Sequence, residues 1–253
     1  MNKNSPYHGL EETQYKKKTE ELVNAHPLKL CEIKNIALFC WDILWKTRIG
    51  ENKTGINLKE LDVPATVVGY FFEKLFAKEL NRKYPDEWRG CIAKDEKDLV
   101  YNPSPYYSIE IKTSGQLGTK IYGNRSFNQK GIKKDDSERK DKSGFYITVN
   151  FFNQTITLIR FGWIDFSDWQ PQKSPTGQMS GLPDYVYSFK LIEIQGKYRW
   201  GSPIRLVPGI GDATAKKLIS SGINNIKELL SYNGNDKNII KLCNNAKSFL
   251  NSE

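Results

Sequence analysis

The sequence predicts an α/β protein in two parts, an α/β domain over residues 1–200 and a small all-α unit over residues 203–253. Segments with helical periodicity come first, and segments rich in β-branched and aromatic residues follow, which favours a sheet covered by helices. After "YRWGSP" the composition changes to short helical segments. A chain of 253 residues is long enough for one sizeable core with an appended unit.

Three helices are predicted ahead of the sheet. Residues 11–25 and 28–48 carry apolar residues at helical spacing. A third helix starts at Pro64, which suits a first helical turn, and its apolar stripe runs to "NRKYPD". Glu79 falls inside this stripe and Glu73 at its margin. A carboxylate in an apolar stripe requires a partner or a metal, unless the stripe opens to solvent in its last turn.

The strand signals follow these helices. They cover residues 98–101, 107–113, 145–152, 155–162 and 187–194. The Asn-Gln pair between the third and fourth strands is typical of a tight hairpin turn.

Two long polar stretches interrupt the strands. Residues 128–144 are of mixed charge, and residues 168–183 contain Gln, Lys, Ser and Thr without periodicity. Each stretch is either a solvated loop or a DNA contact, since Gln and Lys side chains can read base edges in the major groove.

The overall charge favours an anionic partner. Thirty-eight Lys and Arg against 29 Asp and Glu give a formal charge of +9, which suits nucleic acid or an acidic membrane surface. The N-terminus has no apolar core of signal-peptide length, and no run of about eighteen apolar residues occurs, so we expect a cytoplasmic protein without membrane association.

The cysteine and histidine content argues against two classes of site. The four cysteines show no C-x-x-C spacing, which gives no sign of a zinc site or a disulfide framework. His8 and His26 are the only histidines, and we expect them at the surface or capping helices. Catalysis that depends on histidine is therefore disfavoured.

The segment "DLVYNPSPYYSIEIKTS", residues 98–114, places two acids and a lysine on two touching strands. If Tyr101 lies opposite Tyr107 in an antiparallel hairpin, Asp98 lies opposite Glu110, with Cβ atoms about 5 Å apart. Lys112 shares the face of Glu110, because alternate side chains of a strand point the same way. Three charges of two signs therefore converge beside an apolar layer.

This arrangement is sufficient for metal-assisted phosphodiester hydrolysis. The carboxylates of Asp98 and Glu110 and the backbone carbonyl of Ile111 suit Mg²⁺, which prefers oxygen ligands and keeps several waters. A metal neutralises phosphate charge, and Lys112 can orient or deprotonate the attacking water. On spacing alone, the alternative is an exposed strand with a cross-strand ion pair.

The acid-x(11)-Glu-x-Lys pattern after an amphipathic helix resembles the PD-(D/E)-x-K nuclease superfamily, although Lys97 stands where its name implies proline. More specifically, five motifs in order resemble the ScaI family of type II restriction endonucleases over residues 5–195. They are "SPYHG", "KDLVYNPSPYYSIEIKTS", "YGNRSF", "FGWIDFSDW" and "QKSPTGQMSGLP".

The resemblance implies a nuclease core with a central mixed sheet flanked by helices. It implies a Mg²⁺-dependent enzyme that cuts both strands of double-stranded DNA at a short palindrome. Asp98 and Glu110 are then the metal ligands, with Glu79 as a further candidate, and Lys112 activates the water. A homodimer is expected because a two-fold protein matches a two-fold site. A DNA methyltransferase is the expected genetic partner in a bacterial-type cell, since the host must protect its own sites.

Two motifs of the resemblance are candidates for target recognition. "YGNRSF" and "QKSPTGQ" contain the side chains that we expect to contact DNA, namely Arg125, Gln172, Lys173 and Gln178.

Residues 206–230, "LVPGIGDATAKKLISSGINNIKELL", match a helix-hairpin-helix motif. Gly209, Ile210 and Gly211 would let the backbone approach a phosphate, with helix amides as donors and with Lys216 and Lys217 adding charge. Such contacts grip DNA without reading its sequence. The alternative is a helical hairpin used for packing or dimer contacts.

Three functional hypotheses follow. The first is a type II restriction endonuclease. The second is a structure-specific or repair nuclease, because nuclease cores are often fused to helix-hairpin-helix units. The third is a DNA-binding protein without catalysis. The three charged residues are all present, which disfavours the last of these.

Overall fold

The fold was determined from a computed structural model that describes residues 5–51, 53–124, 142–171 and 179–251. The three predicted helices are observed and precede the main sheet. They are α1 (Glu12–Ala25), α2 (Leu30–Lys46) and α3 (Ala65–Lys83). A short hairpin, β1 (Arg48–Ile49) with β2 (Ile56–Asn57), lies between α2 and α3. Pro64, predicted to start the third helix, is the N-cap residue directly before the first residue of α3, Ala65.

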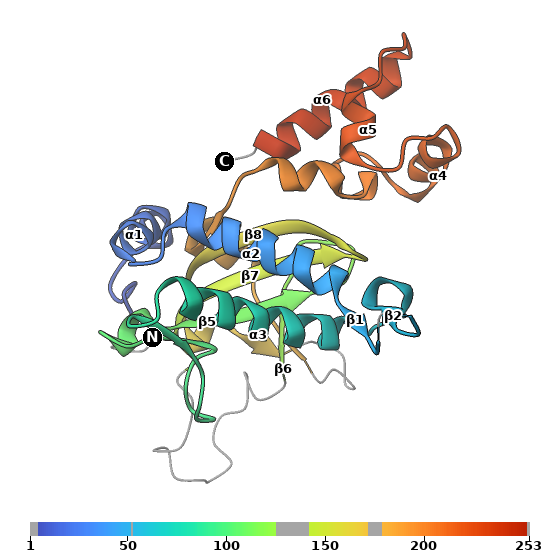
Figure 1. Ribbon diagram of the computed structural model, residues 1–253. Coiled ribbons are helices and arrows are strands. Elements are labelled where there is room, and N and C mark those ends of the chain that lie inside the picture. The colour runs from blue at the N-terminus through green and yellow to red at the C-terminus, as the bar shows by residue number, and fades with distance from the viewer. Residues whose placement is uncertain (1–4, 52, 125–141, 172–178, 252–253) are drawn as a thin grey trace.

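The main sheet has six strands in the order β11-β8-β7-β5-β4-β3 (Figure 1). Their bounds are β3 Trp88–Gly90, β4 Leu99–Tyr101, β5 Ile109–Ser114, β7 Gly144–Phe152, β8 Thr155–Ile164 and β11 Leu191–Glu193. β5 and β7 run parallel, whereas the other neighbours are antiparallel. The predicted mixed sheet is therefore confirmed. The Asn-Gln turn joins β7 to β8, with Asn153 at φ 51°.

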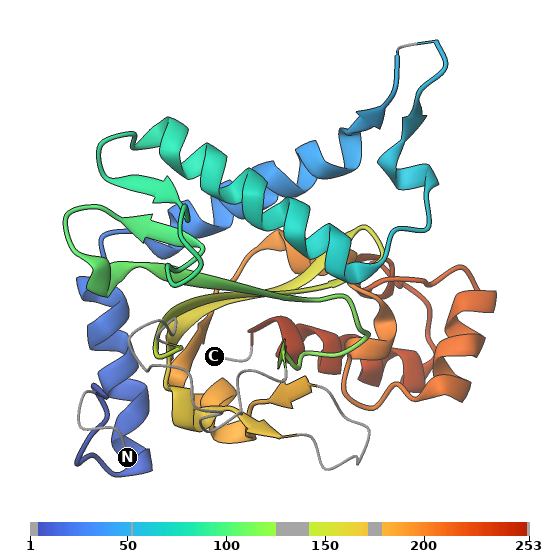
Figure 2. The same cartoon turned by 90° about the horizontal axis from the view of Figure 1, so that it is seen from below.

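The two faces of this sheet have different covers (Figure 2). α2 and α3 lie over one face, which we call the helix face, and the largest hydrophobic cluster fills the space between them. The opposite face carries a smaller apolar cluster that contains Tyr146, Ile164 and Leu191. On this side lies a small sheet of β6 (Tyr122–Asn124), β10 (Met179–Gly181) and β9 (Gln170–Pro171). We call this side of the main sheet the open face.

The segment 187–194, predicted as one strand, is only partly extended. Val186–Lys190 form a π-helix, and β11 begins at Leu191. Lys190 lies in this π-helix because its side chain reaches two buried carboxylates of a neighbouring segment, Asp165 and Asp168. A tertiary contact thus overrides the β-propensity of the aromatic and β-branched residues.

His26 is the C-cap of α1, one of the two roles expected for it, and it is fully buried rather than at the surface. The Leu28 amide donates to its Nδ1, so Nε2 carries the proton and lies 3.0 Å from the Tyr107 carbonyl oxygen. Burial lowers the pKa of His26 to about 4. His26 therefore acts as a neutral hydrogen-bonding group inside the core.

The C-terminal helices have their own hydrophobic cluster, formed by residues from Ile204 to Leu250. They are α4 (Asp212–Ser220), α5 (Ile226–Leu230) and α6 (Lys237–Asn251), and they lie apart from the main sheet in Figure 1. No helix in the described ranges is both long and apolar enough to cross a membrane.

Candidate active site

The hairpin of β4 and β5 has the register that the sequence predicts. Leu99 pairs with Ile109, and continuing this antiparallel register by one residue sets Asp98 opposite Glu110. Ser108 fixes the connection, because its hydroxyl oxygen accepts from the Tyr101 amide at 3.1 Å. We call Asp98, Glu110 and Lys112 the candidate triad.

Direct contacts hold the triad together. Asp98 Oδ2 accepts a hydrogen bond from the Ile111 amide at 2.7 Å. Lys112 Nζ donates to Glu110 Oε1 at 2.7 Å and to the Ile111 carbonyl oxygen at 3.3 Å. The chain around Ile111 thus links all three side chains.

The two carboxylates of the triad are buried, which costs free energy unless their charge is compensated. Asp98 is 8% exposed and Glu110 is 3% exposed, whereas the Lys112 side chain keeps 20% of its surface. Ile109 and Ile111 alternate with these residues and pack into the core on the helix face. Buried carboxylates are tolerated when cations or donors compensate them, so the site is suited to positive charge.

The oxygens of the triad fit a hard divalent cation. The two carboxylates and the Ile111 carbonyl are oxygen donors close together, and Mg²⁺ is typically bound by one or two carboxylates while it keeps several waters. Within the described ranges, no three His, Cys, Asp or Glu side chains gather into a metal-binding group. A cation here would therefore have few protein ligands, as Mg²⁺ tolerates and Zn²⁺ does not.

The structure does not place Glu79 beside the triad. Its two carboxylate oxygens each accept from Arg82 at 2.8 Å, and this pairing lowers the pKa of Glu79. α3 covers the helix face, where Gly69 packs against Thr113 of β5, whereas Glu110 points to the open face. Glu73, also on α3, pairs with Lys74 at 2.7 Å.

Two described strands adjoin the segments predicted to recognise DNA, and both strands lie on the open face. β6 begins the "YGNRSF" segment, and it pairs antiparallel with β10, which follows "QKSPTGQ". Arg125, Gln172, Lys173 and Gln178 lie outside the described residues. The pairing of β6 with β10 nevertheless shows that their flanking strands are neighbours.

The predicted helix-hairpin-helix segment forms two short helices, α4 and α5, joined by a turn. Gly209 has φ +89° and Gly211 directly precedes α4, while Ile210 packs into the C-terminal cluster. A side chain at Gly209 would be strained at that φ. Lys216 and Lys217 are exposed on α4.

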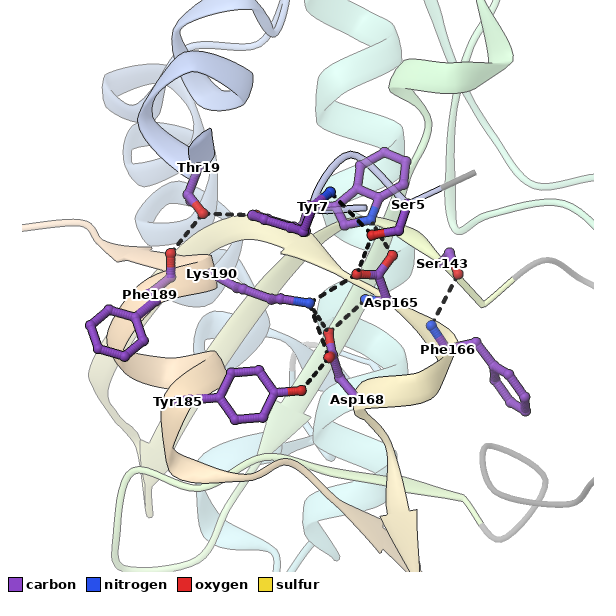
Figure 3. Close-up of polar contacts among 11 residues, drawn as sticks. Ser5, Tyr7, Thr19, Ser143, Asp165, Phe166, Asp168, Tyr185, Phe189 and Lys190 are labelled. Atoms are coloured by element: carbon purple, nitrogen blue, oxygen red, sulfur yellow. Dashed lines mark hydrogen bonds and ion pairs between the residues drawn. The ribbon is translucent and has the colours of Figure 1, made fainter. Parts of the chain in front are cut away.

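A second group of two acids and a lysine was missed by sequence reasoning (Figure 3). Lys190 Nζ lies 2.9 Å from Asp165 Oδ2 and 2.9 Å from Asp168 Oδ2. We call Asp165, Asp168 and Lys190 the buried cluster. Its lysine is also 4.4 Å from the centre of the Tyr7 ring.

Neutral donors complete the buried cluster. Asp165 accepts from the Ser5 hydroxyl at 2.8 Å and from the Trp163 indole at 3.0 Å. The Tyr185 hydroxyl donates to Asp168 Oδ1 at 2.6 Å, and burial together with this contact raises the pKa of Tyr185. The motifs "SPYHG" and "FGWIDFSDW" are therefore joined here, although they are far apart in the sequence. The only sequence signal was the presence of two acids three residues apart after a strand.

The chain is similar to known restriction enzymes. A family model described as "ScaI restriction endonuclease" matches residues 5–195. A curated relative, "Type II restriction enzyme ScaI" of Streptomyces caespitosus, is 35% identical over 199 residues, covering 75% of this chain and 84% of the relative. A solved structure described as "Restriction endonuclease in complex with substrate DNA" has a TM-score of 0.35 and 13% identity, and covers 80% of this chain and 97% of that chain.

The matched range contains both strands of the triad and every residue of the buried cluster, whereas the C-terminal helices lie beyond it. The assignment rests on the family model and on the identity to the curated relative. The chain belongs to the ScaI family of type II restriction endonucleases and is a site-specific nuclease.

Proposed function

We propose that the protein is a Mg²⁺-dependent type II restriction endonuclease that hydrolyses both strands of duplex DNA at a short palindromic site. The observation that carries this proposal is the triad, in which two buried carboxylates and a partly exposed lysine meet around the Ile111 backbone. Hydrolysis by such enzymes leaves 5′-phosphate and 3′-hydroxyl ends, because the 3′ oxygen is the leaving group.

In this proposal Asp98, Glu110 and the Ile111 carbonyl hold the Mg²⁺. The ion supplies charge neutralisation at the phosphate and a bound water close to it. Asp98 is held for this role by the Ile111 amide, which fixes one carboxylate oxygen and leaves its orientation defined.

Lys112 orients the water that attacks phosphorus, and once it has released a proton to solvent, its neutral amine can accept the proton of that water. The amine is suited to this because its side chain is partly exposed, while its partner Glu110 is buried beneath it. Attack in line with the departing 3′ oxygen needs the water held opposite that oxygen. Lys112 lies on β5, an interior strand of the main sheet, and its register partner is Thr148 of β7.

The active form in this proposal is a homodimer, in which each triad cuts one strand of a two-fold site. Such an enzyme works in the cytoplasm of a bacterial-type cell, with a DNA methyltransferase encoded as its genetic partner. Arg125, Gln172, Lys173 and Gln178 are proposed to contact the recognised bases, and the pairing of β6 with β10 supports a shared recognition surface.

The chain is proposed to comprise a catalytic domain at 1–200 and a DNA-binding domain at 203–253. The separate hydrophobic cluster of α4, α5 and α6 supports this division. Backbone amides near Gly209, Ile210 and Gly211 and the exposed Lys216 and Lys217 would hold DNA phosphates. This unit also favours a second candidate, a structure-specific nuclease.

One digest distinguishes these functions. Purified protein is incubated with unmethylated phage and plasmid DNA in Mg²⁺ or in EDTA, and fragment ends are sequenced. Discrete bands that require Mg²⁺ are expected, with one sequence at every end. Nicking that depends on forks or flaps rather than on sequence would favour the second candidate.

The triad is tested in the same assay by Asp98→Ala. Loss of the ligand and of the Ile111 contact should abolish cleavage while binding to cleavable DNA persists in a mobility-shift assay. Retained cutting by the pure variant would remove Asp98 from the mechanism.

A further inference from the structure

Four polar residues form one row across the main sheet. Lys112 of β5 is in register with Thr148 of β7, and Thr148 with Arg160 of β8. Arg160 is in register with Glu193 of β11. All four lie on the open face, because Ile147 and Val149, the neighbours of Thr148 in β7, pack on the helix face.

Thr148 is the unexplained member of this row. It is 0% exposed, and its Oγ1 has no hydrogen-bond partner among the residues that the structure describes. A buried hydroxyl without a partner costs free energy that a valine of the same shape would avoid. This suggests that the hydroxyl acquires a partner in another state of the protein.

Arg160 does not supply that partner. Its NH1 donates to the Thr119 carbonyl at 3.0 Å and to Asn150 Oδ1 at 3.1 Å, and its Nε faces Glu193 at 3.5 Å. The other neighbour of Thr148 in the row is Lys112.

The proposed function requires Lys112 to change its hydrogen-bond partner. Its Nζ donates to Glu110 Oε1 at 2.7 Å, so the ammonium occupies a carboxylate oxygen that the proposed function assigns to a divalent cation. When that oxygen binds a divalent cation, the cation and the ammonium repel each other, so the ammonium must move away. The adjacent strand is only about 4.8 Å away, which is within reach of a flexible lysine side chain.

We propose that Thr148 is a positioning residue whose Oγ1 accepts a hydrogen bond from Lys112 Nζ once Glu110 binds the cation. The hydroxyl then holds the amine on the open face, where the attacking water lies. This inference rests on the proposed function. It adds a second position for Lys112 and a role for a residue of β7, a strand that carries none of the triad.

The chain offers a matched control for the test. Thr157 of β8 is 2% exposed, and its Oγ1 likewise has no hydrogen-bond partner in the described ranges. Thr148→Val and Thr157→Val therefore remove the same kind of hydroxyl. Thr148→Ser keeps the hydroxyl and removes a methyl group.

The first measurement needs no cleavage. Mn²⁺ alone is titrated by calorimetry into metal-free wild type and each variant. Loss of the acceptor should leave Lys112 on Glu110, so Thr148→Val should bind Mn²⁺ about tenfold more weakly, as expected for one hydrogen bond to a charged group. Thr148→Ser and Thr157→Val should bind like the wild type.

The second measurement separates kcat from KM in the Mg²⁺ cleavage of a DNA carrying the mapped site. Thr148→Val should lower kcat by about tenfold with KM for DNA unchanged, because the contact concerns the water and not the DNA. Thr148→Ser should restore kcat. Melting temperatures are measured first, and Thr148→Ala replaces Thr148→Val if the latter does not fold.

Wild-type kcat and Mn²⁺ affinity in Thr148→Val would overturn the inference, as would a defect that Thr148→Ser does not repair. Equal losses in Thr157→Val would show a general effect of removing a buried hydroxyl and would also overturn it. Failure of the proposed function looks different, because wild type would then not cut DNA with Mg²⁺. The Mn²⁺ titration would still decide whether Thr148 supports the release of Glu110.

Discussion

The candidate triad and the buried cluster contain the same residue types, two acids and one lysine, but in opposite environments. The Lys112 side chain is 20% exposed, whereas its ion-pair partner Glu110 is buried. The Lys190 side chain is 4% exposed and is surrounded by aromatic rings, including those of Tyr7 and Tyr15. Residue types alone therefore do not distinguish a site that takes a cation from one that contains its own.

The two groups differ in the source of their positive charge and of their hydrogen-bond donors. In the buried cluster the protein supplies both, because Ser5, Trp163 and Tyr185 donate to carboxylates that Lys190 neutralises. The cluster joins the N-terminal segment to the end of β8 and to the start of β11, so its role is structural. In the proposed function, Lys112 leaves Glu110 and a divalent cation takes its place.

The largest effect is expected from Glu110→Gln. The change removes one metal ligand charge and should lower kcat by roughly a thousandfold, since a metal contributes several kcal/mol to a charged transition state. Glu79→Gln and Glu73→Gln are the matched controls on α3 and should cleave nearly like wild type. Single-turnover cleavage in Mg²⁺ measures all three, and an equal loss in Glu79→Gln would extend the metal site to α3.

The buried cluster should respond in stability instead. Lys190→Met leaves two buried carboxylates without their cation, which should cost about 3–5 kcal/mol and lower the melting temperature by roughly 10 °C. Below the transition, cleavage per folded molecule should stay at the wild-type level.

The control for this change is Lys120→Met, which breaks the exposed Lys120–Asp184 pair at 3.3 Å and should cost at most about 1 kcal/mol. Differential scanning calorimetry gives both values. If Lys190→Met kept normal stability but lost cleavage, the buried cluster would be part of the active site. The contrast between the triad and the buried cluster would then be wrong.

A smaller effect on stability comes from His26, which separates acid sensitivity of the core from that of the two lysine groups. Its pKa in the folded protein is about 4 against an ordinary 6.5, so the unfolded chain binds the proton first as pH falls. The stability from neutral His26, about 3 kcal/mol, is complete above pH 6.5 and lost as pH falls towards 4.

Urea unfolding at several pH values between 4 and 7 measures this loss. His26→Gln should flatten the dependence over this range while lowering stability at neutral pH. Unchanged steepness in His26→Gln would assign the acid sensitivity to carboxylates.

Much of the site could be predicted from local sequence. The register of β4 and β5 follows from the two tyrosines that flank the turn, and Asp98 and Glu110 then face each other across neighbouring strands. The alternation of Ile109 and Ile111 with Glu110 and Lys112 sets the two faces of β5. These relations span only a few residues, so side-chain period and turn length fix them.

Other parts could not be predicted because they depend on distant segments. His26 was expected at the surface or as a helix cap, and it does cap α1, but its burial beside Tyr107 depends on a segment far away in the chain. Glu79 lies in an apolar stripe, as predicted, and pairs with Arg82 three residues later in the same helix, which is a local contact. Tertiary packing decided that α3 covers the helix face, away from Glu110. Lys190 was assigned to a strand because no local pattern reveals partners more than twenty residues away.

The sequence alone determined the α/β class, the helical C-terminal unit and the positions of the triad, because apolar periodicity, composition and strand alternation are local properties of the chain. Tertiary structure alone decided which lysine remained accessible. The N-terminal segment and the aromatic rings bury Lys190. Lys112 instead lies on the open face beside Thr148 and stays partly exposed. The physical reason is burial, since the solvent exposure of a charge depends on which distant segments pack over it.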